Sequence, residues 1–327
     1  MPAQLRFNGS KVELINVDVP PPGAGEMRLR TEWTQVSIGT EIAWIEAQAA
    51  QNKATDLGYS AVGIVEALGP GVTSFKVGQR VMVSAPHASC WNIPASPAYT
   101  VPVPEGLAPE RATLAVLGQI AYHIVERAAP KLLESTVVLG QGVVGSLVLQ
   151  IARMTGADPL IAVDTDPRRL EIAKQVGATH TLNAATDDLV ARVREITGGK
   201  GASLCIEAAT NAKAYQTCCE FLALRGRLVV SSTVYEPVPV YILRDFIERE
   251  ITMLGAHQPK VPIDANPYHP YTQAQNRSAT LNAIRDGRIQ VEHLMTHRVK
   301  PADAPALYQR LREKDRSIVG AFINWTE

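Results

Sequence analysis

Three glycines constrain this chain more than any other feature. Gly140, Gly142 and Gly145 follow a short apolar run and precede a helical pattern. At this spacing Gly140 forms a tight turn, Gly142 lets the backbone approach a pyrophosphate, and Gly145 lets the helix pack on the strand. The N–H groups and the dipole at the start of that helix, around Val143 and Val144, favour an anion. We therefore predict a dinucleotide site here; the alternative is a glycine turn kept only for packing.

An acidic residue follows the second predicted strand. Residues 160–163 are apolar and lead into Asp164, about twenty residues past the glycines. A carboxylate there can bind both ribose hydroxyls and repels a 2′-phosphate, so NAD is predicted in preference to NADP. Arg168 and Arg169 argue the other way, because guanidinium groups can clamp a phosphate. Asp166 balances their charge, and Arg169 is expected to contact the ribose or the pyrophosphate.

Composition excludes several classes of protein. The chain has 327 residues, 46% of them hydrophobic, which is enough for two domains with separate cores. Its formal net charge is zero and no basic run occurs, so small molecules are expected as partners rather than nucleic acid or an anionic membrane. No apolar run approaches the roughly 20 residues that span a bilayer, and the N-terminus lacks a signal sequence. A cytoplasmic protein is expected.

The cysteines do not form a recognisable framework. The chain has four, Cys90, Cys205, Cys218 and Cys219. They are too few and too scattered for a set of disulfides or for a zinc lobe with four thiolates. We expect reduced thiols with structural roles.

The chain changes character along its length. The first hundred or so residues contain short alternating runs separated by Gly and Pro turns, which predicts an all-β unit. From residue 120 strands alternate with helices, which predicts a parallel, doubly wound sheet with ligand at the carboxyl ends of its strands. The tail is too short to fold alone and is expected to return to the β unit. The predicted domains are therefore 1–119 with 258–327, and 120–257, with ligand between them.

Other polar and small residues follow predicted strands, where their backbones would line a cofactor. His257 follows the apolar run 250–255 and is expected near the nicotinamide or the substrate. The remaining positions after strands are Ala208, Ala209, Thr210, Ser231 and Ser232.

These motifs together resemble the medium-chain dehydrogenase/reductase superfamily, which contains zinc alcohol dehydrogenases, sorbitol dehydrogenases and quinone reductases. The resemblance covers essentially the whole chain. It implies an α/β fold with a GroES-like substrate domain and a Rossmann domain, and an assembly of two or four copies. Its anchors are residues 37–41, 58–72, 75–81 and 177–180, with the Gly140 loop and Asp164.

The departures from the family concern zinc. Ile38, Tyr59 and Val116 stand where zinc members have Cys, His and a third Cys or carboxylate. A catalytic zinc needs three ligands of those types, so it is expected to be absent. The structural zinc lobe is missing too, since its region holds one cysteine. His87 and Cys90 could form half of a metal site; the preferred interpretation is pocket wall or loop packing.

Hydrogen-bond donors must then stabilise the developing oxyanion. Tyr59 is the first candidate, because a phenol can donate a proton to a carbonyl or, with a lowered pKa, accept one from an alcohol; the alternative is core packing. Thr40, at the family's proton-relay position, is the second, unless it caps the helix expected near Glu41. Gln119 and His87 complete the set, unless they bind water or backbone.

The sequence thus predicts a zinc-independent, NAD-dependent oxidoreductase that interconverts a secondary alcohol and a ketone by hydride transfer. A polar stretch near residues 266–277, with Tyr268, Tyr271 and Arg277, suggests a polyol, sugar or cyclitol-like substrate. Alternatives are an enone or quinone double-bond reductase of the same superfamily and a non-catalytic NAD(H)-binding protein. A homodimer or homotetramer is expected to form through the apolar edge strand 251–254.

Overall fold

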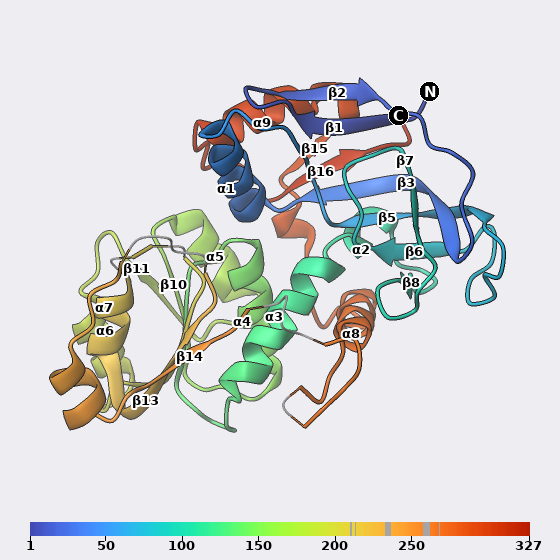
Figure 1. The fold of residues 1–327 in the computed structure, drawn as a ribbon. Helices are drawn as coiled ribbons and strands as arrows, with labels where there is room; N and C mark the ends of the chain where they lie inside the picture. The colour runs from blue at the N-terminus through green and yellow to red at the C-terminus, as the bar shows by residue number, and fades with distance from the viewer. Residues whose placement is uncertain (210, 213, 233–236, 258–261, 268) are drawn as a thin grey trace. The chain divides into compact units, whose positions relative to one another are not determined.

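The computed structural model describes residues 1–209, 211–212, 214–232, 237–257, 262–267 and 269–327. The chain divides into two compact units (Figure 1). Residues 1–117 with 262–327 form the first, here called the β unit, and residues 118–261 form the second, the α/β unit. The sequence placed the two boundaries at residues 119 and 257.

The α/β unit is built on one parallel sheet. Its strands run in the order β11-β10-β9-β12-β13-β14, and every neighbouring pair is parallel. The chain adds strands on one side of β9 and then crosses to add the others on the opposite side, so the switch point lies between β9 and β12. This is the predicted doubly wound sheet. The bounds are β9 (Thr136–Leu139), β10 (Leu160–Asp164), β11 (His180–Asn183), β12 (Ala202–Glu207), β13 (Leu222–Val230) and β14 (Thr252–Gly255).

Local signals set where the helices of this unit begin. Asp166 caps α5 by accepting a hydrogen bond from the Arg168 N–H, and Asp188 caps α6 in the same way. The core between sheet and helices is apolar and includes Cys205, Cys218 and Cys219, which are buried, free thiols. The helices are α3 (Ala115–Ala128), whose residues up to Leu117 belong to the β unit, α4 (Val143–Met154), α5 (Pro167–Gln175), α6 (Leu189–Ile196), α7 (Ala214–Phe221) and the π-helix η1 (Ile242–Glu248).

The β unit contains two sheets. The smaller has the order β2-β1-β4, and the larger runs β15-β16-β3-β5-β6-β8, with β7 also paired to β3. β16 pairs antiparallel with β3, so the C-terminal segment completes the larger sheet. The strands are β1 (Ala3–Phe7), β2 (Val12–Asn16), β3 (Glu26–Val36), β4 (Thr55–Asp56), β5 (Ala61–Leu68), β6 (Arg80–Val83), β7 (Cys90–Pro94), β8 (Val101–Pro102), β15 (His297–Val299) and β16 (Ala321–Asn324).

Helices pack on these sheets. α1 and α9 share a core with β1, built around Phe7, Ile45 and Tyr308. α8 begins at Gln273, where Thr272 and Gln275 form a capping box. None of the helices in the described residues is long and apolar enough to cross a membrane. The helices are α1 (Ile38–Ala49), α2 (Pro109–Ala112), α8 (Gln273–Arg285), α9 (Ala304–Arg312) and the 3-10 turns η3 (Glu292–Leu294) and η4 (Pro301–Asp303).

Candidate functional site

The glycine loop of the α/β unit has the geometry that its sequence predicts. Gly140 has a φ of +93°, and a Cβ there would lie 2.9 Å from the backbone of Ala208. A Cβ on Gly145 would lie 1.8 Å from the Gly140 carbonyl oxygen, so the start of α4 can approach the turn only with glycine. A Cβ on Gly142 would meet nothing within 4 Å. Gly140 and Gly145 are therefore packed against protein backbone, whereas the space beside Gly142 is open.

The N-terminus of α4 follows directly. Gly142 is the N-cap, and having no side chain it leaves the first N–H groups of the helix without a side-chain acceptor. Val143 and Val144 are half-buried at this end. N–H groups in this position suit a phosphate or pyrophosphate, because they also carry the positive end of the helix dipole.

Asp164 is fixed at the end of β10. Its two carboxylate oxygens accept hydrogen bonds from the N–H of Gln141 at 2.7 Å and of Asp166 at 2.9 Å. The guanidinium of Arg169 lies 3.9 Å away, and the Asp164 side chain is 9% exposed. The carboxylate is therefore tied to the glycine loop and retains an accessible edge.

Asp166 forms an ion pair with the neighbouring Arg168. Arg168 Nε and Nη2 lie 3.1 Å and 2.7 Å from its carboxylate oxygens. This pairing lowers the pKa of Asp166 to about 2. Arg168 is thus engaged by a carboxylate on its own turn, as the sequence suggested when it set Asp166 against the arginines.

The remaining predicted cofactor residues lie at strand ends. Ala208 and Ala209 follow β12, Ser231 follows β13, and all three are half-buried. His257 follows β14 and is exposed. Thr210 lies outside the described residues. Sequence reasoning missed Glu207, which ends β12; the available signal was a charged residue closing an otherwise apolar run.

Three hydroxyl groups meet in the β unit. The Tyr59 hydroxyl lies 2.5 Å from Ser37 Oγ and 3.4 Å from Thr40 Oγ1. Ser37 precedes α1, Thr40 stands in its first turn, and Tyr59 comes just before β5. Two of the predicted catalytic residues are therefore brought together, and Ser37 joins them without having been predicted. We call these three residues the hydroxyl cluster.

Burial sets the protonation state of Tyr59. It raises the pKa of the phenol above its ordinary value, against the smaller opposing effect of its hydrogen bonds with Ser37 and Thr40. The lowered pKa that would let Tyr59 accept a proton is therefore not found in this environment, and its role as a donor to substrate stays a prediction. At neutral pH the phenol keeps its proton, which it donates to Ser37 Oγ.

A buried carboxylate supports the hydroxyl cluster. Glu41, in the first turn of α1, is fully buried. Its oxygens accept from the Ser37 N–H at 2.7 Å and from the Tyr308 hydroxyl at 2.5 Å, and His87 Nε2 lies 3.1 Å away. Glu41 thus supports the start of α1. Because α1 begins at Ile38, Thr40 is not its cap and its hydroxyl is available to Tyr59.

His87 is buried beneath the hydroxyl cluster, beside Glu41. Its side chain is 0% exposed, and a Cβ on Gly58, which has a φ of +91°, would lie 2.6 Å from the His87 ring. The predicted role of His87 as a donor to substrate has no support from this position. Gln119 is buried in α3, in the α/β unit, and its role stays a prediction.

The residues at the family's zinc positions do not fit zinc. Ile38 packs against the core around Tyr308, and Val116 is buried. Both oxygens of the nearby Glu41 already accept hydrogen bonds, and the hydroxyl cluster offers only neutral oxygens. Within the described part of the chain, no three His, Cys, Asp or Glu side chains are grouped to hold a metal ion.

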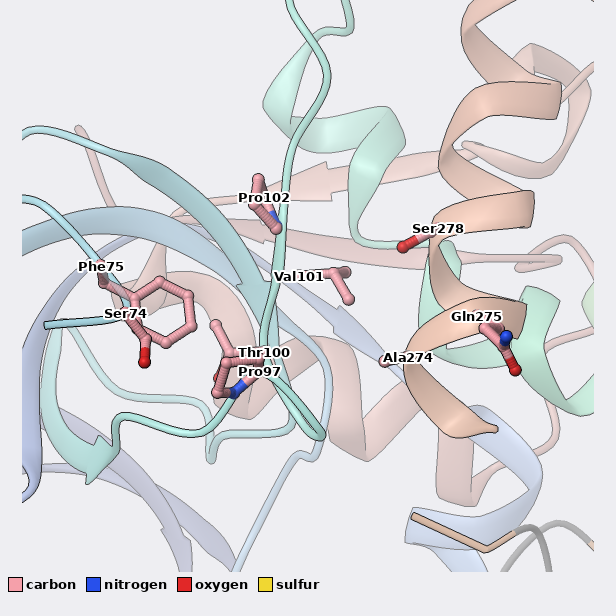
Figure 2. A pocket seen from close by; sticks show the side chains of 9 residues that line it. All are labelled: Ser74, Phe75, Pro97, Thr100, Val101, Pro102, Ala274, Gln275 and Ser278. Atoms are coloured by element: carbon pink, nitrogen blue, oxygen red, sulfur yellow. The ribbon is translucent and has the colours of Figure 1, made fainter. Parts of the chain in front are cut away.

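A separate groove of about 430 Å³ lies on the β unit (Figure 2). Phe75 and Thr100 stand on one side of it and Gln275 of α8 on the other. None of the candidate catalytic residues lines this groove. The remaining lining residues are Ser74, Pro97, Val101, Pro102, Ala274 and Ser278.

Arg277 belongs to the polar stretch that suggested a polar substrate, but in the structure its side chain stabilises the β unit. It is buried and donates to the Tyr99 carbonyl and to Ser84 Oγ. Burial lowers its pKa to about 10. Tyr271 is exposed, and Tyr268 lies outside the described residues.

Comparison with known proteins agrees with this architecture. Residues 23–132 match the family model described as the alcohol dehydrogenase GroES-like domain, and residues 143–269 match that of the zinc-binding dehydrogenases. An alcohol dehydrogenase of Cupriavidus necator is 24% identical over 94% of each chain.

Solved structures share the fold. A short chain alcohol dehydrogenase of Escherichia coli CFT073, complexed with NADH, superposes with a TM-score of 0.84 at 18% identity and 99% coverage of each chain. A protein of Sinorhizobium meliloti 1021 bound to NADP superposes with a TM-score of 0.83 at 18% identity, again with 99% coverage of each. Both nicotinamide nucleotides therefore occur on this fold.

Proposed function

This chain belongs to the medium-chain dehydrogenase/reductase superfamily, and from that premise we propose a zinc-independent, NAD-dependent oxidoreductase that interconverts a secondary alcohol and a ketone. The family assignment and the similarity to alcohol dehydrogenases indicate an alcohol oxidoreductase that uses a nicotinamide cofactor. The finer proposal depends on one observation, the cluster of Ser37, Thr40 and Tyr59 in place of zinc ligands.

Tyr59 is the proposed donor to the reacting oxygen. Its raised pKa keeps the proton on the phenol. The phenol can turn this O–H from Ser37 Oγ to the ketone oxygen as negative charge develops there, while the Ser37 hydroxyl turns to donate to the phenol oxygen. The nicotinamide supplies the hydride when the reduced cofactor is bound. Ser37 and Thr40 hold the phenol oxygen in place. One donor to a developing oxyanion, the role proposed for Tyr59, stabilises the transition state by about 3 kcal/mol in favourable cases.

Glu41 is the proposed support of this arrangement. A buried carboxylate is costly unless it is hydrogen bonded, and here it binds the Ser37 N–H, Tyr308 and His87. These contacts fix the first turn of α1, from which Ser37 and Thr40 project. His87 therefore has a proposed positioning role rather than contact with substrate.

The preference for NAD is supported by the charges around Asp164. Its carboxylate would accept hydrogen bonds from ribose hydroxyls and would repel a 2′-phosphate. Arg168 is held by Asp166, and Arg169 lies 3.9 Å from Asp164 itself, so each arginine has an acidic neighbour within the protein. For these reasons we place NAD before NADP.

A polar substrate, such as a polyol, sugar or cyclitol, is retained as part of the proposal. Hydroxyl groups of substrate and protein can pair well, and the hydroxyl cluster offers three such groups. Arg277 is buried and donates to Ser84 Oγ within the β unit, so the polar stretch near residues 266–277 supports a polar substrate less than the sequence suggested.

We also propose a homodimer or homotetramer that forms through one edge of the α/β unit. β14 is the last strand of its sheet in the described residues. The π-helix just before it exposes apolar side chains, with Leu243 and Ile247 each 63% exposed. A free strand edge beside an apolar surface favours pairing with a second copy. Light scattering at micromolar concentration tests this; a monomer would refute it.

Activity on a panel of ketones and enones, with NADH and NADPH compared, tests the proposed reaction. We expect ketone reduction that is faster with NADH, together with oxidation of the corresponding secondary alcohols by NAD. Reduction of enones alone would establish the double-bond reductase instead. Tight nucleotide binding without turnover on any compound would favour the non-catalytic alternative.

A further inference from the structure

We infer that Glu207 is a positioning residue for the bound cofactor, because its buried carboxylate joins the loops that follow β12 and β13. This inference relies on the nicotinamide site of the proposed function. Glu207 acts through its contacts with these loops and is not assigned a contact with the cofactor itself.

Glu207 closes a central strand. It is the last residue of β12 and stands in register with Leu139 of β9 on one side and Val230 of β13 on the other. Those two residues also end their strands. Glu207 therefore sits, fully buried, at the edge of the sheet where the ligand of a doubly wound fold binds.

The side chain of Glu207 contacts both loops. Oε1 accepts a hydrogen bond from the Ala209 N–H at 2.7 Å, within the loop after β12. Oε2 accepts one from the hydroxyl of Ser232, in the loop after β13. Ser232 Oγ also lies 3.2 Å from the Tyr215 hydroxyl of α7. Burial raises the pKa of Tyr215 to about 12, so that phenol keeps its proton at neutral pH.

The main chain of Glu207 makes the same connection. Its carbonyl oxygen accepts from the Ser231 N–H at 3.1 Å and from Ser231 Oγ at 2.7 Å. The next residue, Ala208, lies against the turn at Gly140, since a Cβ there would come within 2.9 Å of its backbone. The glycine loop and both neighbouring loops therefore meet at this one residue and its immediate successor.

The chemistry of the contacts favours a carboxylate. A carboxylate only accepts hydrogen bonds, so it can serve the Ala209 N–H and the Ser232 O–H at once, each as a charge-assisted hydrogen bond. Glutamine has nearly the same shape but is neutral and has one accepting oxygen, so the Ser232 hydroxyl would have to turn and accept from its amide N–H₂. The exchange replaces charge-assisted hydrogen bonds by weaker neutral ones while leaving the volume of the core almost unchanged.

The test compares E207Q with the wild-type protein and with E171Q, which makes the same exchange on the exposed surface of α5. NADH affinity is measured by fluorescence titration, kcat and KM by steady-state kinetics, and Tm without cofactor. We expect E207Q to raise the Kd of NADH about tenfold, the effect of replacing charge-assisted buried hydrogen bonds by neutral ones, with kcat at saturating NADH little changed. E171Q should match the wild type throughout.

A second variant, S232A, removes only the hydroxyl donor and keeps the test decisive if E207Q does not fold. It should raise the Kd of NADH about threefold to tenfold. Wild-type affinity in E207Q or S232A, or a lower Tm with unchanged Kd and KM, would overturn the inference and leave Glu207 a purely structural role. A wild-type protein that binds neither NADH nor NADPH would instead refute the proposed function, and this inference with it.

Discussion

The hydroxyl of Tyr308 lies 2.5 Å from the buried carboxylate of Glu41, although 267 positions separate the two residues in the chain. This contact ties the C-terminal helix α9 to the first turn of α1. Because Ser37 and Thr40 belong to that turn, the C-terminal segment takes part in placing the hydroxyl cluster.

Replacement of Tyr308 by Phe tests this connection. The change removes one of the donors to Glu41 and leaves a buried acceptor less satisfied, so the free energy of unfolding should fall by about 1–3 kcal/mol. Urea unfolding measures the loss, and kcat should fall by a smaller factor than in Tyr59→Phe. Tyr271→Phe, on an exposed tyrosine of the same unit, is the control and should change neither quantity. Unaltered stability in the Tyr308 variant would contradict the support assigned to Glu41.

Tyr59→Phe removes the proposed donor while keeping the ring. We expect kcat for ketone reduction to fall by roughly a factor of 100, which corresponds to about 3 kcal/mol of lost oxyanion stabilisation. The Kd of NADH should stay unchanged, because the glycine loop and Asp164 are untouched. Ser37→Ala should give a smaller loss of kcat, since it leaves the phenol in place but removes its partner at 2.5 Å. Wild-type turnover by the Phe variant would rule out Tyr59 as the donor.

The pH dependence of ketone reduction follows from the raised pKa of Tyr59. The active form is the protonated phenol, so activity due to this group is fully present below its pKa and is lost as pH rises through that value. Because burial moves the pKa above its ordinary value of 10.0, the rate should not fall through this group between pH 7 and 9. The decline at higher pH should be missing in Tyr59→Phe. A decline centred near neutral pH that disappears in this variant would mean that the pKa is lowered instead.

Asp164→Ser tests the choice of nucleotide. Removing the carboxylate takes away an acceptor for the ribose and the repulsion of a 2′-phosphate, and it frees Arg169 from its nearest acidic neighbour at 3.9 Å. The ratio of kcat/KM for NADH to that for NADPH should fall by about tenfold or more. Asp187→Ser, on an exposed acidic residue of the same unit, serves as the control. An unchanged ratio would show that Asp164 does not set the preference.

The parts of this fold that could be predicted are those with local signals. The spacing of Gly140, Gly142 and Gly145, and the alternation of apolar strands with amphipathic helices, predicted the doubly wound sheet, and the structure confirms it. The start of β13 at Leu222 has no such local signal, because its first residues are less apolar and continue the pairing only through a register shift.

The site was less predictable because its contacts join distant segments. No spacing rule brings Tyr308 to Glu41, and nothing in the sequence near His87 indicates that Gly58 will approach its ring and enclose it. Ser37 was missed for a related reason, since a serine before a helix is usually read as a cap, whereas its side chain makes no capping hydrogen bond here.

Turnover of metal-free enzyme tests the central claim most directly. Protein dialysed against a strong chelator is analysed for zinc and assayed in parallel for NADH-dependent reduction of a ketone substrate, before and after zinc is added back. We predict full activity at a zinc content far below one ion per chain and no gain on addition of zinc. Activity that disappears with the metal and returns in proportion to bound zinc would contradict the account, because uncharged hydroxyl groups would then not be what polarises the reacting oxygen.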